Sequence, residues 1–201
     1  PHGIHIHYQA PEKGLKRKKF LLAVSDLYVQ KNFKNLLLAI AALRIEYPAI
    51  HLKIAGSPLD PPYFASLKKL ISQNGIEENV TFLGKQTPDQ LLKLYQSCRI
   101  FVFPSSVETF GNPLVEAMAC GAPIACSESA AMPEVIGDAA EYFDPFDVED
   151  MVSAIRKLIS DEELCEKLGE RAIKRANFFS WEKTAEKTVN VFKRVMISKN
   201  I

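Results

Sequence analysis

Short apolar runs alternate with longer amphipathic segments along most of the chain. The apolar runs have the length of buried strands, and the run 100–103 (IFVF) contains large apolar residues alone, which is typical of a strand covered on both faces. We expect strands at 20–25, 50–55, 79–83, 100–103, 123–126 and 141–143. The segments between them repeat apolar residues at helical spacing, which predicts helices at 36–43, 63–71, 88–97, 113–119, 133–136, 148–160, 162–176 and 181–197.

The order of these elements predicts the fold class. A strand followed by a helix, repeated about six times, gives right-handed crossover units and therefore an α/β, doubly wound parallel sheet of the Rossmann-like kind. In such sheets ligands bind beyond the carboxyl ends of the strands, where the strand order reverses. The candidate binding loops therefore follow Ser25, Ala55, Leu83, Phe103 and Cys126.

Composition and charge exclude several classes of protein. Hydrophobic residues make up 47% of the chain and charged residues 24%, which is typical of a globular protein and excludes a disordered one. The net charge of +1 gives no support for a nucleic-acid partner. No apolar stretch approaches the roughly 18 residues that a membrane-spanning helix needs. We expect a cytoplasmic protein and, because the chain begins at Pro1 without a Met, a piece of a longer one.

A basic run precedes the first expected strand. It comprises Lys13, Lys16, Arg17, Lys18 and Lys19. We interpret this run as a solvated linker to a preceding domain. Peripheral contact with anionic lipid at the inner face of a membrane is the alternative interpretation.

The histidines and cysteines are not spaced as a metal site. His2, His5 and His7 alternate with Ile4 and Ile6, which favours a half-exposed strand or linker over a cluster of metal ligands. The four cysteines contain no C-x-x-C pair, which argues against a zinc ribbon or a thioredoxin-type site. We therefore expect neither a metal nor another cofactor.

The loop after the fourth expected strand has the features of an anion site. Asn112 followed by Pro113 predicts a helix start, with Asn112 as the capping side chain. The first-turn amides of that helix, with Gly111 permitting close approach, suit a diphosphate. Glu116 lies on the same apolar helix, and Glu108 lies in the loop before it. From spacing alone, Glu116 has a second interpretation, as a residue that complements the helix dipole or caps neighbouring amides.

These residues resemble a known family. Glu108 and Glu116, in the segment PSSVETFGNPLVEAMACGAPIACS, resemble the E-x7-E signature of the family 4 retaining glycosyltransferases, the group 1 glycosyltransferase domain of the GT-B fold. Further segments are similar to those of the family at 25–34, 80–84, 133–136, 144–145 and 179–182. The resemblance covers residues 20–195, which is nearly the whole chain.

The resemblance implies that the chain is one half of a GT-B glycosyltransferase. Residues 20–178 would form the nucleotide-sugar-binding Rossmann-like domain, 1–19 a linker or crossover segment and 179–201 a C-terminal helix, with the N-terminal acceptor domain absent from this chain. The implied reaction is retaining transfer of a hexose from a UDP- or GDP-sugar to a glycan or a lipid-linked acceptor. No metal is expected, because no D-x-D motif stands in a suitable loop. We expect the isolated chain to be inactive, since the other domain would bind most of the acceptor.

The resemblance also implies roles for individual residues. Glu108 and Lys31 would be catalytic: Glu108 at the sugar, favouring positive charge at the anomeric carbon, and Lys31 neutralising the departing diphosphate. For Lys31 the alternative is a solvated lysine at a helix start. Glu116 would accept hydrogen bonds from the ribose hydroxyls. The other implied donor-binding residues are Ser25 in the donor loop, Gly84 and Lys85 beside the base, and the backbone amides of Phe110, Gly111, Asn112 and Leu114.

The chain departs from the family pattern at two places. Asp26 stands where the family usually has an Arg, and Ala130–Ala131 stand in a loop that often contains Gly. An acidic side chain near a diphosphate is unfavourable unless it points away. Either Lys31 and the helix dipole suffice, or Arg99 or Lys85 substitutes, or donor affinity is low.

Two alternatives to an active transferase follow. One is a non-catalytic nucleotide-binding module whose active loop has decayed, and the other is an epimerase of the same GT-B fold. A dinucleotide dehydrogenase is disfavoured, because no G-x-G-x-x-G follows the first expected strand.

Overall fold

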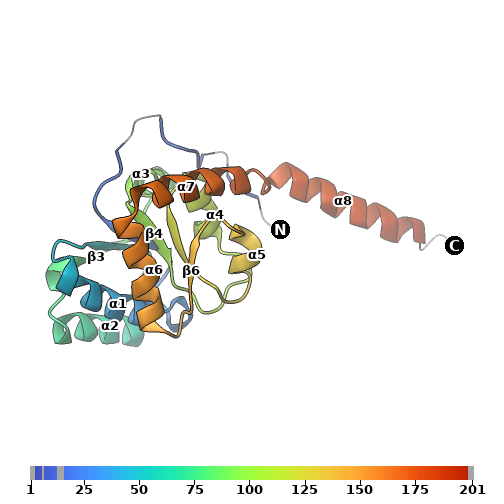
Figure 1. The fold of residues 1–201 in the computed structure, drawn as a ribbon. Coiled ribbons are helices and arrows are strands. Elements are labelled where there is room, and N and C mark those ends of the chain that lie inside the picture. Colours follow the sequence, from blue (N-terminus) through green and yellow to red (C-terminus); the bar gives the residue numbers. More distant parts are fainter. Residues whose placement is uncertain (1–2, 6, 13–15, 199–201) are drawn as a thin grey trace.

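Parallel strands form a six-stranded sheet with helices on both faces (Figure 1). The computed structural model describes residues 3–5, 7–12 and 16–198. The strand order is β3-β2-β1-β4-β5-β6, and every neighbouring pair is parallel. The strands are β1 (Leu21–Val24), β2 (Leu52–Ala55), β3 (Val80–Gly84), β4 (Ile100–Phe103), β5 (Ile124–Ser127) and β6 (Glu141–Phe143). This confirms the predicted doubly wound α/β sheet.

Helices fill the connections, as the apolar spacing predicts. They are α1 (Phe33–Glu46), α2 (Pro61–Gln73), α3 (Pro88–Ser97), α4 (Asn112–Ala119), α5 (Met132–Ile136), α6 (Val148–Ser160), α7 (Glu162–Ala176) and α8 (Trp181–Ser198), with short 3-10 turns η1 (Val29–Lys31) and η2 (Glu77–Asn79). The largest difference from the sequence prediction is α1, which is longer than 36–43 because polar residues at both ends interrupt its apolar stripe.

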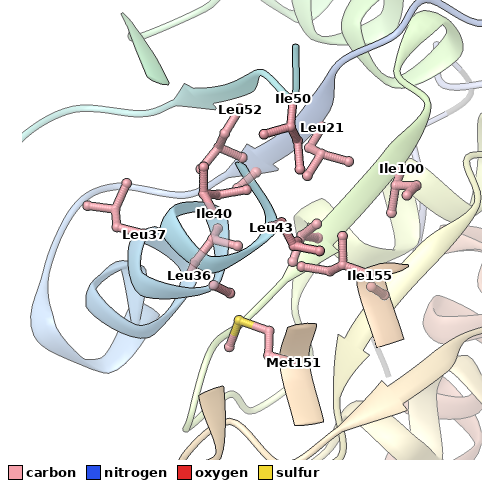
Figure 2. Close-up of a cluster of buried hydrophobic side chains, with 14 of the residues drawn as sticks. Leu21, Leu36, Leu37, Ile40, Leu43, Ile50, Leu52, Ile100, Met151 and Ile155 are labelled. Carbon is pink, nitrogen blue, oxygen red and sulfur yellow. The ribbon is translucent and has the colours of Figure 1, made fainter. Parts of the chain in front are cut away.

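Each inner strand buries side chains on both faces of the sheet, which explains the continuous apolar runs. In β1, Leu21 and Ala23 belong to one core, whereas Leu22 and Val24 belong to the other. Figure 2 shows the first core, where α1 and α6 pack over β1, β2 and β4. The second core lies beneath α3, α4 and α5, and α7 contributes to both cores.

The strand order reverses between β1 and β4. These strands are neighbours in the sheet, but α1, which follows β1, covers the face of the first core. The helix that follows β4, α4, covers the opposite face. The loop after β1 and the loop after β4 therefore lead to opposite faces of the sheet. They separate at the carboxyl ends of the strands, which is where a doubly wound sheet forms a binding crevice.

Arg17 fastens the N-terminal segment to the ends of two helices. Its guanidinium donates to the carbonyls at the C-terminus of α3, with Nη1 lying 3.0 Å from the oxygen of Gln96, and to those of Cys120 and Gly121 after α4. A cation is favourable there because unpaired carbonyls and the negative dipole ends of both helices converge.

The prediction of a solvated basic linker is therefore wrong for Arg17, whose guanidinium donates hydrogen bonds within the folded domain. Lys16, Lys18 and Lys19 are exposed, as predicted, and Lys13 lies outside the described residues. Residues 3–5 and 7–12 form neither helix nor strand, which favours the linker interpretation of His5 and His7 over a strand, and His2 is outside the described residues.

The last helix, α8, extends away from the body of the molecule (Figure 1). At its base, the amide of Ile4 donates to the carbonyl of Phe179, so the N-terminal segment lies beside the start of α8. Gly3 packs so closely on this turn that an added Cβ would lie 2.2 Å from the amide nitrogen of Trp181. Within 3–5, 7–12 and 16–198, no helix combines the length and apolar character needed to cross a membrane.

Arg17→Ala is expected to lower the free energy of unfolding by about 2–4 kcal/mol, because carbonyls at two helix ends lose a charged donor. Arg17→Lys is expected to restore only part of this loss, since one ammonium group cannot span both helix ends. Urea unfolding measures the effect. The control is Lys19→Ala, an exposed neighbour expected to change stability by less than about 0.5 kcal/mol. Equal effects of Arg17→Ala and Lys19→Ala would contradict the role of Arg17.

Candidate functional site

A cleft of about 470 Å³ lies at the carboxyl ends of β1, β2 and β4. Its walls come from the loops after β1, β2, β3 and β4, which are four of the five loops expected from the sequence; the loop after Cys126 does not contribute. The lining residues are Val24, Ser25, Asp26, Tyr28, Lys31, Ala55, Gly56, Lys85, Gln86, Leu91, Glu108, Thr109, Phe110, Gly111, Asn112, Pro113 and Glu116.

Lys31 and Glu108 form an ion pair inside the cleft. Their side chains are only 12% and 13% exposed, and the Lys31 ammonium donates to Oε1 of Glu108. Backbone and side-chain bonds from Ser106 to the carbonyl of Gln30 join the two loops that carry them. Lys31 is therefore not a solvated lysine at a helix start, and the structure holds both charges at one place.

Asn32 fixes the position of Lys31. It adopts the left-handed conformation (φ 54°) between η1 and α1, and its side-chain amide donates to the carbonyls of Pro104, at 3.1 Å, and Pro145, at 2.7 Å. These bonds tie the turn after β1 to the loop after β4. The loops that form the cleft are thus joined to one another by hydrogen bonds.

Gly111 caps the start of α4, so the prediction that Asn112 is the capping residue is wrong. Gly111 is the N-cap residue with φ 79°, and Asn112 is the first helical residue with no side-chain capping bond. The left-handed turn favours glycine, and the ring of Phe103 lies 3.2 Å from where a Cβ would stand. Among the residues that the structure describes, the amides of Gly111 and Asn112 donate to no backbone carbonyl, so they suit an anion.

Leu114 differs from its predicted role as an amide donor to the ligand. Its amide donates to the carbonyl of Gly111 at 2.9 Å, its side chain is buried, and it does not line the cleft. The first turn of the helix therefore uses this donor internally. Phe110 does line the cleft, and its ring packs edge-on against Phe179 at 5.4 Å.

Glu116 enters the cleft from the second turn of α4. Its Oε2 accepts a hydrogen bond from the hydroxyl of Tyr95 at 2.9 Å, which differs from the sequence interpretation of a residue that caps neighbouring amides. Burial raises the pKa of Glu116 to about 7, and the bond from Tyr95 opposes this rise. Near neutral pH the carboxyl group is therefore close to balance between its charged and neutral forms.

Asp26 joins the loop after β1 to the loop after β2. Its Oδ1 accepts from the amide of Ser57 at 2.8 Å, so the carboxylate pins the loop after β2. Next to it, the backbone of Gly56 approaches Ser25 so closely that an added Cβ would lie 1.9 Å from the Ser25 carbonyl oxygen. The Asp26 carboxylate, at the position where the family pattern predicts an Arg, therefore makes a structural contact.

The basic side chains that line the cleft are Lys31 and Lys85. Arg99 does not substitute for the missing Arg, because it donates to the carbonyl of Ile159 and pairs with Glu162 away from the cleft. Gly84 does not line the cleft; its carbonyl accepts from the amide of Gly56, and its neighbour Lys85 reaches the cavity instead.

Tyr95, Tyr28 and Gln86 belong to the site region and were not expected from the sequence. Tyr95 occupies an ordinary helical position, and its contact with Glu116 joins residues 21 positions apart. Only the packing of α3 against α4 creates that contact, so no local signal reveals it. Within the described part of the chain, no three His, Cys, Asp or Glu side chains group as metal ligands would.

Comparison with known proteins shows the family. The family model "Glycosyl transferases group 1" matches residues 8–175, and the chain belongs to this family. It is 34% identical over 178 residues to the O-antigen chain mannosyltransferase B of Escherichia coli, covering 87% of this chain and 45% of that protein. The curated relatives are longer: this chain spans 22% of a mannosyltransferase WbdA of the same species.

Solved structures support the fold. Sucrose-phosphate synthase of Thermosynechococcus elongatus superposes with a TM-score of 0.85 at 23% identity, covering 98% of this chain and 52% of that one. HepE of Anabaena, solved with UDP and glucose, superposes with a TM-score of 0.78 at 21% identity, covering 89% of this chain and 49% of that one. The fold is that of half of a GT-B glycosyltransferase.

The pH dependence of stability is expected to report on Glu116. Its pKa of about 7 in the folded protein exceeds the value of about 4.3 for an unfolded chain, so its stabilising contribution is complete below about pH 4.3. That contribution is lost as the pH rises through about 7. Glu116→Gln removes the loss, and the variant should gain stability relative to wild type between about pH 5 and pH 8.

Urea unfolding at a series of pH values measures this gain. Glu166→Gln, which changes an exposed carboxylate on α7, is the control and is expected to follow the wild-type profile. Parallel pH profiles of Glu116→Gln and wild type would show that Glu116 has no raised pKa.

Proposed function

We propose that the protein is a retaining hexosyltransferase that transfers a hexose from a UDP- or GDP-sugar to a glycan or a lipid-linked acceptor. The observation that carries the proposal is the convergence of Lys31, Glu108, Glu116 and the amides of Gly111 and Asn112 on one cleft at the reversal of strand order. An anion site beside two carboxylates is what a sugar diphosphate requires. Phosphate oxygens need donors, and sugar hydroxyls need acceptors.

The proposed donor pose follows the walls of the cleft. The diphosphate lies over the start of α4, where the amides of Gly111 and Asn112 and the helix dipole favour negative charge. The ribose hydroxyls donate to Glu116, and the base lies toward Lys85. The hexose lies toward Glu108. In this pose, Lys31 exchanges its bond with Glu108 for the diphosphate.

In the proposed reaction, the bond between the anomeric carbon and the diphosphate oxygen breaks, and its electron pair stays on the diphosphate. Lys31 and the amides stabilise this charge, which is the kind of preorganised electrostatic help that lowers a transfer barrier. Glu108 stabilises the positive charge that develops on the sugar. The acceptor oxygen then bonds to the anomeric carbon, and its proton leaves with the diphosphate.

Relatives give independent support for this reaction class. The similar Escherichia coli proteins are named mannosyltransferases, and HepE was solved with UDP and glucose. Since this chain spans less than half of those Escherichia coli proteins, we assign most of the acceptor binding to polypeptide outside it. We propose a cytoplasmic location, where the exposed Lys16, Lys18 and Lys19 would favour an anionic membrane surface.

A non-catalytic nucleotide-binding module is the second candidate, because among the described residues no Arg side chain lines the cleft. Glu108 separates the two functions. In a transferase Glu108 acts on the reacting sugar, whereas in a binding module its loss leaves the function intact.

Glu108→Gln in the complete native polypeptide is expected to lower kcat by about 10²–10³-fold, because a transition-state charge loses its partner. Lys31→Ala is expected to weaken donor binding and lower kcat as well. Calorimetric titration with UDP- and GDP-sugars measures binding. The rate of sugar transfer to extracts that contain glycan or lipid-linked acceptors measures kcat. Lys34→Ala changes an exposed lysine in the first turn of α1; it is the control and should leave both unchanged.

Two results would contradict the proposal. If wild type binds neither UDP- nor GDP-sugars, the cleft is not a donor site. If donor binding is present and Glu108→Gln transfers sugar at the wild-type rate, Glu108 is not catalytic.

A further inference from the structure

Tyr95 carries a hydroxyl group inside the second core, on α3. The residue is 0% exposed, and its ring packs edge-on against Phe101 at 5.5 Å and against Tyr8 of the N-terminal segment at 5.9 Å. A buried hydroxyl requires a hydrogen-bond partner, and Tyr95 has one in Oε2 of Glu116. Because Glu116 lines the cleft, this bond joins a core residue to the candidate donor site.

We propose that Tyr95 is a positioning residue for donor binding, whose hydroxyl holds Oε2 of Glu116 and leaves the remaining acceptor sites of the carboxylate to the ribose hydroxyls. The inference rests on the proposed role of Glu116 as the ribose ligand. The last torsion of a glutamate is broad, so a bond to one oxygen sets the plane of the carboxylate. Oε1 accepts no hydrogen bond from the described residues, which leaves this oxygen for a ligand.

The ring packing makes this bond rigid. Tyr95 lies between a strand residue, Phe101, and Tyr8, so its hydroxyl has little freedom to move away from Glu116. Arg17 holds the same two helices from their C-terminal ends through the carbonyls of Tyr95 and Gly121. The carboxylate is therefore positioned by α3 and by the N-terminal segment, in addition to its own helix.

The same bond affects the charge of the carboxyl group. Burial raises the pKa of Glu116 to about 7, and hydrogen bonding from Tyr95 lowers it, because the bond stabilises the charged form. Only the ionised carboxylate has all of its lone pairs available to ribose hydroxyls.

Three neighbours of Glu116 have pKa values that burial raises. Burial raises the pKa values of Tyr8 and Cys120 to about 12 and that of Tyr95 well above 10, so these neighbours stay neutral near pH 7. The charged side chains around the cleft are Asp26, Lys31, Lys85 and Glu108. Because the Tyr95 hydroxyl donates to Glu116, a change in binding near pH 7 that depends on this hydroxyl reports on Glu116.

The test is Tyr95→Phe in the complete native polypeptide, which removes the hydroxyl and keeps the ring. Binding of UDP and GDP is measured by calorimetry between about pH 6 and pH 9. Without its donor, the pKa of Glu116 should rise by about one unit, so the ionised fraction at pH 7 falls from about a half to about a tenth. We expect about fivefold weaker binding at pH 7, a pH profile displaced upward by about one unit, and a smaller difference at pH 9.

Two comparisons separate positioning from general damage. Tyr142→Phe removes the hydroxyl of a partly buried tyrosine, which donates to the carbonyl of Gly137 away from the cleft, and this variant should bind as wild type does. Nucleotides that lack both ribose hydroxyls should bind equally to wild type and to Tyr95→Phe. If Tyr95→Phe loses as much affinity for these nucleotides as it loses for UDP and GDP, Tyr95 only supports the fold, and the proposal is overturned.

The remaining outcomes are also decisive. Coincident pH profiles of wild type and Tyr95→Phe would overturn the proposal while leaving the proposed function intact. Absence of UDP and GDP binding in wild type would overturn both. If Tyr95→Phe does not fold, the side-chain carboxyl resonance of Glu116 and the Cζ resonance of Tyr95 are followed together by NMR in wild type: the Tyr95 resonance should shift as Glu116 titrates, and a Tyr95 resonance that stays constant through the titration of Glu116 would overturn the proposal.

Discussion

The adjacency of β1 and β4 is the constraint on which the site depends. The two strands share hydrogen bonds, yet the helices that follow them cover opposite faces of the sheet. The segments after the strands must therefore diverge, and a cleft opens between them. This divergence places three central residues of the site: Lys31 follows β1, Glu108 follows β4, and Glu116 lies on the helix after that loop.

The cleft concentrates charge in partly buried surroundings. The structure offsets the unfavourable burial of Lys31 and Glu108 by pairing them, and that of Glu116 by a hydrogen bond from Tyr95. The remaining penalty appears as the raised pKa of Glu116. Groups held in this way need little rearrangement to meet a charged ligand, which is a common reason for a functional site to reduce stability.

The fold was largely predictable from the sequence, and the site only in part. Apolar runs buried on both faces, such as 100–103, identify strands because one physical effect, burial, dominates them. The loop with Glu108 and Glu116 was found because its residues are close in sequence. The prediction of a cap at Asn112 is wrong because Gly111 adopts a left-handed conformation and takes the capping position. The partners of Arg17 and Tyr95 could not be predicted, because they depend on packing between elements distant in sequence.

A crystal structure of the complete polypeptide with a bound nucleoside diphosphate tests the central claim most directly. The account predicts the diphosphate at the start of α4, within hydrogen-bonding distance of the amides of Gly111 and Asn112, with Lys31 turned toward it and the ribose against Glu116. A diphosphate bound elsewhere, with the pair of Lys31 and Glu108 unchanged, would contradict the account.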